Sequence, residues 1–448
     1  MRKRTFSIGG VHPNDHKIAR DCAIEDLPLA PIFSVSMSQH LGAPANPVVA
    51  AGDKVRTGQI IGEPSGFISA YVHSPVSGTV KSVAPRANLL GHKIVHVDIE
   101  VEGDEWMEDI DRTPDIVREI TLDREQILDR IKKCGVVGLG GATFPTHVKL
   151  SPPPGKKADV LILNGAECEP YLTSDYRIML ERGEEIVIGA EIMKKALEVD
   201  RVVIGIEENK PEAIENMLRI TASHPGIEVM ALKKRYPQGG EKQLINAVTG
   251  RQVPSMKLPI DAGAVVQNVG TSLAVYEAVQ KNKPLIDNVL TVTGECCPQQ
   301  RNLRVRVGTP LSFILEQSGG MPKDAVKIIS GGPMMGWAIS NLEATTVKST
   351  SSLLCLTAEQ TLRKEEGNCI RCGKCVDACP MGLEPYLLNR LARARKLDEL
   401  EENAIYDCIE CGCCLYSCPA NIPLLDTIRV YKREVLAIMK NRASATAK

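Results

Sequence analysis

The 448-residue sequence is poor in aromatic residues and in net charge, and it lacks any long apolar run. Aromatic side chains make up 4% of it, and the formal net charge is −1 at pH 7. This balance gives no indication of a nucleic-acid partner, because such a partner needs a basic surface and aromatic stacking platforms. No apolar run approaches the roughly 18 residues that span a bilayer, so we expect any membrane association to come through other subunits.

The first 17 residues also lack the apolar segment of a signal peptide. We therefore expect a reducing cytoplasm, in which the 15 cysteines serve as thiols or thiolate ligands and not as disulfides. The hydrophobic content of 43% is ordinary for a globular protein. The length predicts about three domains, at about 150 residues per domain.

The strongest signal is a cysteine pattern that occurs twice. The sequence C-x2-C-x2-C-x3-C-P runs from Cys369 to Pro380 and again from Cys408 to Pro419. This spacing is typical of bacterial ferredoxins, whose thiolates hold 4Fe-4S clusters. Zinc also binds CxxC pairs, but it does not explain a third cysteine at the same spacing and a fourth before proline. The predicted ligands are Cys369, Cys372, Cys375 and Cys379 in the first run, and Cys408, Cys411, Cys414 and Cys418 in the second.

Two runs of this kind predict two 4Fe-4S clusters with crossed ligands. In two-cluster ferredoxins the fourth cysteine of each run binds the other cluster. We therefore expect Cys379 to join the second run and Cys418 to join the first. The 28-residue connection between Cys379 and Cys408 leaves open that each run closes on itself. Cys413 breaks the spacing, so we predict that it is not a ligand.

Changes of pattern divide the chain into four predicted domains of a multidomain α/β and α+β protein. Residues 1–105 alternate short apolar runs with turns and are β-rich. Residues 106–285 alternate strands and helices, which predicts a parallel sheet with ligands beyond the carboxyl ends of its strands. Residues 286–345 form a small α+β unit. Residues 346–448 are helical around the cysteine runs, with one helix expected over residues 385–400.

The β-rich part resembles the barrel-sandwich hybrid domains that carry lipoyl or biotinyl groups. The resemblance lies in residues 51–80, with Ala-Gly-Asp-Lys-Val at their start and Ser-Pro-Val-Ser-Gly-Thr-Val at their end. In those carriers an exposed hairpin bears the modified lysine. The matching hairpin, Ser65–Tyr71, has no lysine, so we expect the fold without the prosthetic arm.

A glycine-rich segment at residues 135–141 is a candidate phosphate cradle. Backbone amides without side chains can surround a phosphate, and Lys149 can add positive charge. By itself the segment is equally typical of a plain turn, since it follows a predicted helix and not a strand.

Four short segments resemble, in order, the NADH-oxidising flavoprotein subunit of respiratory complex I. They are residues 138–149, 164–170, 239–242 and 267–271. In that family these segments hold FMN and the nicotinamide nucleotide. The resemblance departs at Leu139 and Ala166, where the family has an arginine and an aspartate. It implies FMN contacts from Gly138, Gly140, Gly141, Lys149, Asn164 and Asn268, and a nucleotide pocket lined by Glu167 and Glu241.

Residues 286–345 resemble the β-grasp ligand-binding module beside the flavin domain of complex I. The whole order, from barrel-sandwich hybrid through flavin domain and β-grasp module to the paired cysteine runs, resembles the C subunit of the Rnf electron-transport complex. That family implies a peripheral, NAD-dependent flavin iron–sulfur oxidoreductase in an ion-translocating translocase at the cytoplasmic face of the cell membrane. The implied partners are other subunits of that complex and NAD(H), with ferredoxin as an indirect partner.

The implied chemistry is hydride exchange between NAD(H) and FMN, followed by single electrons through the two clusters, with no catalytic side chain. One alternative is a soluble flavin iron–sulfur cobalamin reductase, whose barrel-sandwich domain lies near the other end of the chain. Another is a polyferredoxin-like carrier without dehydrogenase activity, which needs no flavin. A third is a scaffold whose clusters only stabilise folding.

Overall fold

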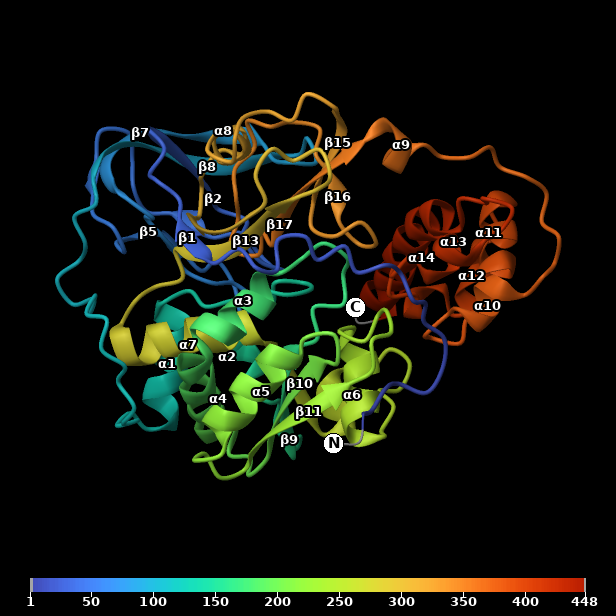
Figure 1. The fold of residues 1–448 in the computed structure, drawn as a ribbon, viewed down its shortest axis with the longest axis horizontal. Helices are drawn as coiled ribbons and strands as arrows, with labels where there is room; N and C mark the ends of the chain where they lie inside the picture. Colours follow the sequence, from blue (N-terminus) through green and yellow to red (C-terminus); the bar gives the residue numbers. More distant parts are fainter. Residues whose placement is uncertain (1–2, 447–448) are drawn as a thin grey trace.

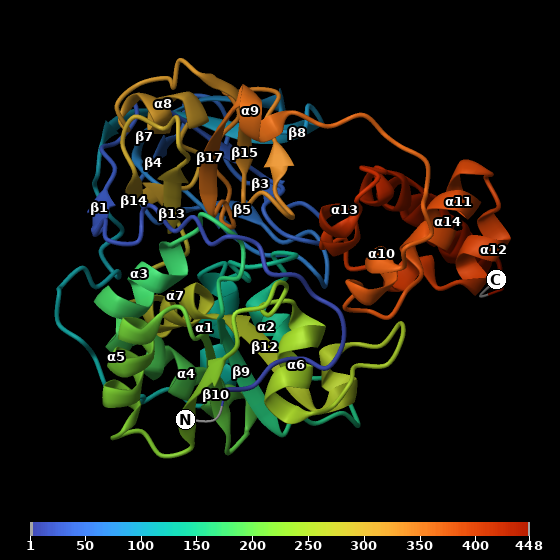
Figure 2. The same ribbon diagram turned by 45° about the vertical axis from the view of Figure 1, so that its right-hand side comes forward.

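The computed structural model describes residues 3–446, in which a lower α/β layer carries an upper layer of β-sheets, with a helical domain at one side (Figure 1). The helical domain lies beside the two layers, as the turned view shows (Figure 2). Within residues 3–446, no helix combines the length and the apolar character required to cross a membrane.

The lower layer is built on a four-stranded parallel sheet in the order β11-β10-β9-β12. Its strands are mostly apolar because helices cover both faces. Leu161 and Leu163 face the side of α4 and α7, whereas Val160 and Ile162 face the side of α6. The strands are β9 (Val160–Gly165), β10 (Val202–Glu207), β11 (Ile227–Leu232) and β12 (Ala264–Asn268). The helices are α1 (Arg124–Lys133), α2 (Thr146–Lys149), α3 (Ser174–Glu181), α4 (Gly183–Leu197), α5 (Pro211–Thr221), α6 (Glu241–Thr249), α7 (Val269–Lys281) and the 3-10 helix η1 (Pro259–Ala262).

Two small sheets in the upper layer enclose an apolar core that includes Phe33, Ile61 and Val97. The hairpin Ser65–Tyr71 joins β5 to β6, and Phe67 at its tip is 83% exposed. The first sheet contains β2 (Ile32–Ser36), β8 (Lys93–Gly103), β7 (Ser77–Ala87) and β4 (Lys54–Val55). The second contains β3 (Asn46–Pro47), β5 (Ile60–Glu63) and β6 (Val72–His73).

The third sheet of the upper layer draws strands from three parts of the chain. Its central strand β13 pairs antiparallel with β14 and parallel with β17. The predicted bounds of this unit, 286–345, therefore exclude two of its strands, β1 and β17. The local sequence pattern does not show which strands pair with distant parts of the chain. In spatial order the strands are β1 (Ile24–Asp26), β14 (Arg301–Arg306), β13 (Asp287–Thr293), β17 (Ser352–Thr357), β15 (Ala325–Ser330) and β16 (Trp337–Ala338), with α8 (Leu311–Glu316) beside them.

The helical domain packs Leu388, Leu391, Leu400, Ile428 and Val435 into its own core. The prediction of one helix over residues 385–400 is wrong: α11 ends at Arg393 and α12 begins at Leu397. Arg395 between them has φ +54°, a left-handed conformation that ends a helix. The helices of this domain are α10 (Lys374–Asp377), α11 (Pro385–Arg393), α12 (Leu397–Glu402), η2 (Ile405–Asp407), α13 (Cys413–Ser417) and α14 (Leu424–Thr446). The short helix α9 (Ala358–Thr361) precedes the domain and lies against β15 and β17 (Figure 1).

The N-terminal segment, residues 3–17, belongs with the α/β layer although the barrel follows it in sequence. Arg4 forms a β-bridge with Leu232, and Val11 forms one with Tyr236. The segment also reaches the helical domain, where Gly10 N donates to Ala378 O at 2.9 Å. It therefore ties the carboxyl edge of the parallel sheet to the cysteine-bearing domain.

Candidate functional site

The parallel sheet has one topological switch point, between β9 and β12. The chain builds β10 and β11 on one side of β9 and then returns to place β12 on the other side. Asn164 and Asn268 stand opposite each other in register at the carboxyl ends of these two strands. Ligands of open α/β sheets bind in the crevice at this position. The fold thus brings two predicted flavin contacts to the expected place.

The glycine-rich loop lies directly beside Asn268. A Cβ added to Gly140 would stand 3.5 Å from the Asn268 Cβ, so the loop passes close to the carboxyl end of β12. Gly141 has φ +65° and open space around it, and both glycines are exposed. Leu139 N fixes the loop by donating to Thr271 Oγ1 at 2.9 Å. A bare backbone held open over a sheet edge fits a phosphate-bearing cofactor such as FMN.

Asn268 also begins α7 at this edge. Its Oδ1 accepts a hydrogen bond from Gly270 N at 2.7 Å, which makes it the N-cap of the helix. The start of a helix favours negative charge because its first N–H groups are unpaired. The loop and the helix start therefore offer donors beside the same edge of the sheet.

Two further predicted residues are joined by an ion pair. Lys149 Nζ lies 2.7 Å from Glu241 Oε1 and donates to Val266 O at 2.9 Å. Lys149 ends α2, whereas Glu241 begins α6. Asn164 is tied to the same region, since its Nδ2 donates to Gly239 O at 2.8 Å. The ion pair therefore holds Lys149, a predicted flavin contact, beside Glu241, a predicted nucleotide contact.

Glu167 differs from the other predicted residues because its side chain turns into the interior. Its side chain is 3% exposed, and its Oε1 accepts from Asp175 N at 2.8 Å. Lys17 Nζ lies 3.9 Å from its Oε2. Burial raises the pKa of Glu167, and the two nearby lysines act against that rise. Its expected contact with the nucleotide stays a prediction.

Sequence reasoning missed Asp175, which adjoins the crevice. Its Oδ2 accepts a hydrogen bond from Asn268 Nδ2 at 2.7 Å. Burial and the nearby charge of Glu167 raise the pKa of Asp175 to about 7. The only clue in the sequence is its position soon after the acidic turn at residues 167–169.

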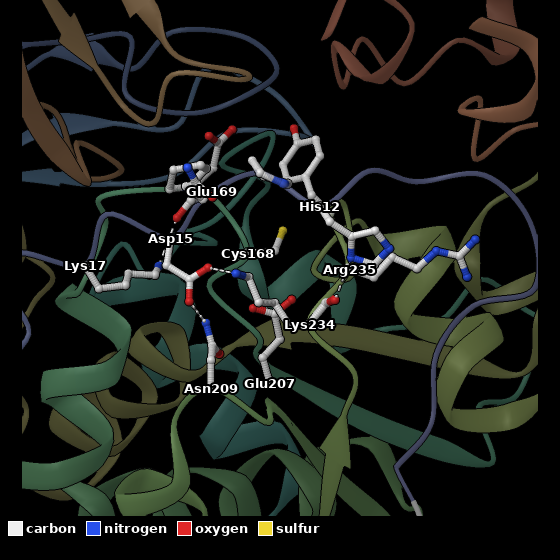
Figure 3. A pocket seen from close by; sticks show the side chains of 13 residues that line it. His12, Asp15, Lys17, Cys168, Glu169, Glu207, Asn209, Lys234 and Arg235 are labelled. Carbon is white, nitrogen blue, oxygen red and sulfur yellow. Dashed lines mark hydrogen bonds and ion pairs between the residues drawn. The ribbon is translucent and has the colours of Figure 1, made fainter. Parts of the chain in front are cut away.

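A polar cavity opens between the N-terminal segment and the carboxyl ends of β9, β10 and β11 (Figure 3). Asp15 pairs there with Lys234 and accepts a hydrogen bond from Asn209 Nδ2 at 3.0 Å. Lys17 donates to the backbone oxygens of Glu167, Glu169 and Leu172 at 2.6–2.9 Å. One mostly buried lysine therefore holds the acidic turn that leads from β9 to α3.

The carboxylate of Glu169 joins this turn to the β-grasp sheet. It accepts hydrogen bonds from Met334 N at 3.1 Å and from Met335 N at 2.8 Å. Burial raises the pKa of Glu169 to about 7. A Cβ at Gly332 would come within 2.1 Å of its Oε2, so only glycine fits beside the carboxylate.

Five cysteines line one apolar cavity in the helical domain. One belongs to the first run and four to the second: Cys379, Cys408, Cys411, Cys413 and Cys414. All of them except Cys413 are predicted ligands. Within residues 3–446, no three His, Cys, Asp or Glu side chains are close enough to hold a single metal ion. A 4Fe-4S cluster spaces its thiolates farther apart than a single ion does, so four cysteines around a cavity suit a cluster.

The remaining predicted ligands are only partly assembled. Cys375 and Cys418 both pack against an apolar cluster that contains Cys414, whereas Cys369 and Cys372 lie exposed on a loop. Cys413 is buried, and its Sγ lies 3.9 Å from Tyr236 O. Tyr236 in turn donates from its hydroxyl to Cys411 O at 2.9 Å. The second run therefore faces the α/β layer.

Four family models match consecutive parts of the chain. The RnfC barrel sandwich hybrid domain matches residues 5–105, and the Nuo51 FMN-binding domain matches residues 131–277. The SLBB domain matches residues 289–338, and the 4Fe-4S dicluster domain matches residues 365–422. Together with the observed sheets and helices, these matches confirm the predicted fold class.

Similar proteins of known name cover nearly the whole chain. The C subunit of the proton-translocating ferredoxin:NAD(+) oxidoreductase complex of Clostridium ljungdahlii is 45% identical over 88% of this chain and 86% of its own. The Na(+)-translocating counterpart of Acetobacterium woodii is 43% identical over 98% of both chains. The C subunit of the ion-translocating oxidoreductase complex of Rhodobacter capsulatus is 42% identical over 96% of this chain and 83% of its own.

Proposed function

The chain belongs to the family of C subunits of ion-translocating ferredoxin:NAD(+) oxidoreductase complexes, and on this basis we propose that it exchanges electrons between NAD(H) and one-electron partners. Membership confirms the family resemblance predicted from the sequence. The chain is an oxidoreductase subunit with an FMN-binding domain and a 4Fe-4S dicluster domain, and other subunits of the complex are its partners.

The observation that carries the proposal is the exposed glycine loop over the switch point, between Asn164 and Asn268. FMN, when bound, connects two-electron hydride chemistry to the single electrons that iron–sulfur clusters accept. In the proposal, the backbone of residues 138–141 and the start of α7 hold its phosphate. Lys149 adds positive charge, and the two asparagines orient the ring system.

We assign Glu241 to the nucleotide side of the crevice. Its ion pair with Lys149 holds the carboxylate at the start of α6, where the helix dipole favours a negative charge. From that position it can accept hydrogen bonds from a ribose. The same pair keeps Lys149 directed toward the crevice. Glu241 therefore positions both the nucleotide and the lysine.

For the clusters we propose the crossed ligand sets. One set is Cys379, Cys408, Cys411 and Cys414, and the other is Cys369, Cys372, Cys375 and Cys418. The cavity lined by the first set, together with Cys413, supports this division. Cys375 and Cys418 both pack against the apolar cluster that contains Cys414, which brings the two sets close together. Crossing keeps the two clusters close, which suits fast electron transfer between them.

The direct and indirect electron-transfer partners follow from the same proposal. NAD(H) binds this chain directly, whereas ferredoxin exchanges electrons with it through other subunits. We place the chain peripherally at the cytoplasmic face of the membrane, where its complex translocates ions.

The first experiment is anaerobic purification followed by cofactor analysis and a spectrum after addition of NADH. We expect about one FMN and about eight irons per chain, as for two 4Fe-4S clusters. NADH should bleach the flavin band and then reduce the clusters. A flavin band that NADH leaves unchanged in intact holoprotein would contradict the dehydrogenase assignment.

A second experiment separates the roles of the crevice residues. Glu241→Ala should raise the KM for NADH while flavin stays bound, because the backbone contacts of residues 138–141 with the phosphate remain. The matched control is Glu228→Ala, since Glu228 lies on the same domain, is 49% exposed and pairs with Arg201. Loss of flavin from Glu241→Ala would instead place Glu241 on the flavin side.

A further inference from the structure

One carboxyl group next to Asn268 is not among the residues that the proposal assigns to the cofactor or the nucleotide. Asp175 is the second residue of α3, and its Oδ2 accepts from Asn268 Nδ2 at 2.7 Å. Asn268 cannot turn its amide around, because its Oδ1 already accepts from Gly270 N. Asp175 therefore lies one side chain away from the switch point, and it keeps partial exposure.

The surroundings of Asp175 hold more acids than bases. Glu167 lies against its backbone N–H, and Glu207 and Lys210 form a buried pair at 3.6 Å. Lys17 contributes the second positive charge, 3.9 Å from Glu167 Oε2. Three carboxyl groups thus share one buried region with two lysines.

The excess of one carboxyl group over the lysines favours retention of one proton in this buried region. Each lysine donates its hydrogen bonds mainly to backbone oxygens. Lys17 donates to three of them, and Lys210 donates chiefly to Ala166 O at 2.7 Å. Glu167 Oε2 is buried without a hydrogen-bond partner. Burial followed by the charge of Glu167 raises the pKa of Asp175 to about 7, so its carboxyl can bind and release a proton near neutral pH.

The proposed reaction requires such a group. Oxidation of NADH yields NAD+, two electrons and one proton, and the iron–sulfur clusters accept only the electrons. One proton must therefore leave the crevice for each hydride passed on, and one must enter in the reverse direction.

We propose that Asp175 is the proton-exchanging residue of the crevice, taking the proton onto its carboxylate and releasing it to solvent. Glu167 acts through it as a positioning residue, and Lys17 and Lys210 balance the remaining charge. This inference rests on the proposed function, because without hydride chemistry no proton needs to be moved.

Asp175→Asn tests the inference, because the amide oxygen can still accept from Asn268 while the exchangeable proton is lost. In the variant holoprotein, flavin content and NADH affinity should stay unchanged. Cluster reduction by NADH should fall by about 10²-fold, the size of a general acid–base contribution. Asp175→Glu should restore much of the rate, which a purely structural hydrogen-bond role would not allow.

A spectroscopic readout keeps the test independent of turnover. With ¹³C-labelled aspartate, infrared difference spectra across a pH range of about 5–9 should contain a carboxylic-acid band that titrates near neutrality and vanishes in Asp175→Asn. The control Asp159→Asn should keep the band, since Asp159 is 55% exposed and pairs with Arg251. Should Asp175→Asn fail to fold, Glu167→Gln serves instead, and removal of its charge should move the titration to lower pH.

Unchanged rates and an unchanged band in Asp175→Asn, or an unmoved titration in Glu167→Gln, would overturn the inference while leaving the proposed function intact. A wild-type flavin that NADH does not reduce would overturn both.

Discussion

The two cysteine runs have the same spacing but opposite surroundings. In the first run, Cys369 and Cys372 are exposed on a loop. In the second run, Cys411 and Cys414 are buried beside a cavity that also takes in Cys379. The local motif is the same in both, so the difference comes from how the helical domain docks.

The docking contacts lie around the second run and the end of the first run. Tyr236 donates to Cys411 O, and Gln243 Nε2 donates at 3.2 Å to the O of Pro380, which follows Cys379. Met334 of the β-grasp sheet adds a third contact, since its O would stand 3.2 Å from a Cβ at Gly412. We therefore expect one cluster to face the flavin crevice and the other to face outward, toward a partner.

The largest expected effect is that of Cys379→Ala. Cys379 belongs to the first run in sequence but to the cavity of the second run in space, so we expect loss of about four of about eight irons. The EPR spectrum should resemble that of Cys411→Ala. A spectrum like that of Cys372→Ala would show that each run closes on itself.

A chelator should remove iron from the two runs at different rates, because the runs differ in exposure. Because Cys369 and Cys372 are exposed, a chelator added to anaerobic holoprotein should remove about four irons quickly and about four slowly. EPR of the half-depleted protein should retain the signal that Cys411→Ala abolishes. Release in a single phase would mean that the two clusters are equally protected.

Tyr236→Phe should destabilise only the side of the helical domain that contacts the α/β layer. The change leaves Cys411 O without its donor, and an unsatisfied buried acceptor costs about 1–3 kcal/mol. We expect a lower thermal midpoint and an altered EPR signal from the second-run cluster only. The control is Tyr416→Phe, because Tyr416 is 55% exposed on α13. Equal effects from both variants would contradict a specific role for Tyr236.

The smallest effect should come from Cys413→Ser. Cys413 lies between Cys411 and Cys414, and its Sγ is 3.9 Å from Tyr236 O. We expect the variant to keep about eight irons, because four other cysteines already complete each cluster. Loss of about four irons would make Cys413 a ligand.

Local patterns predicted much of the α/β domain. The alternation of strands and helices over residues 106–285 predicted a parallel sheet, and β9, β10, β11 and β12 form one there. The prediction of one helix over residues 385–400 was wrong, because the stripe of leucines persists across the left-handed Arg395. Periodicity reports which residues are apolar, and it is insensitive to a change of one backbone angle.

The sequence by itself determined the cysteine spacing, the glycine loop and the residues that follow each parallel strand, because these depend on neighbours along the chain. Only the tertiary structure decided that Cys379 lies with the second run, that Glu167 turns inward, and that Asp175 meets Asn268 across 93 residues. It also supplied β1 and β17 to a sheet whose other strands lie between them in sequence. Burial and electrostatic environment are properties of contacts between distant segments, and such contacts exist only once the chain has folded.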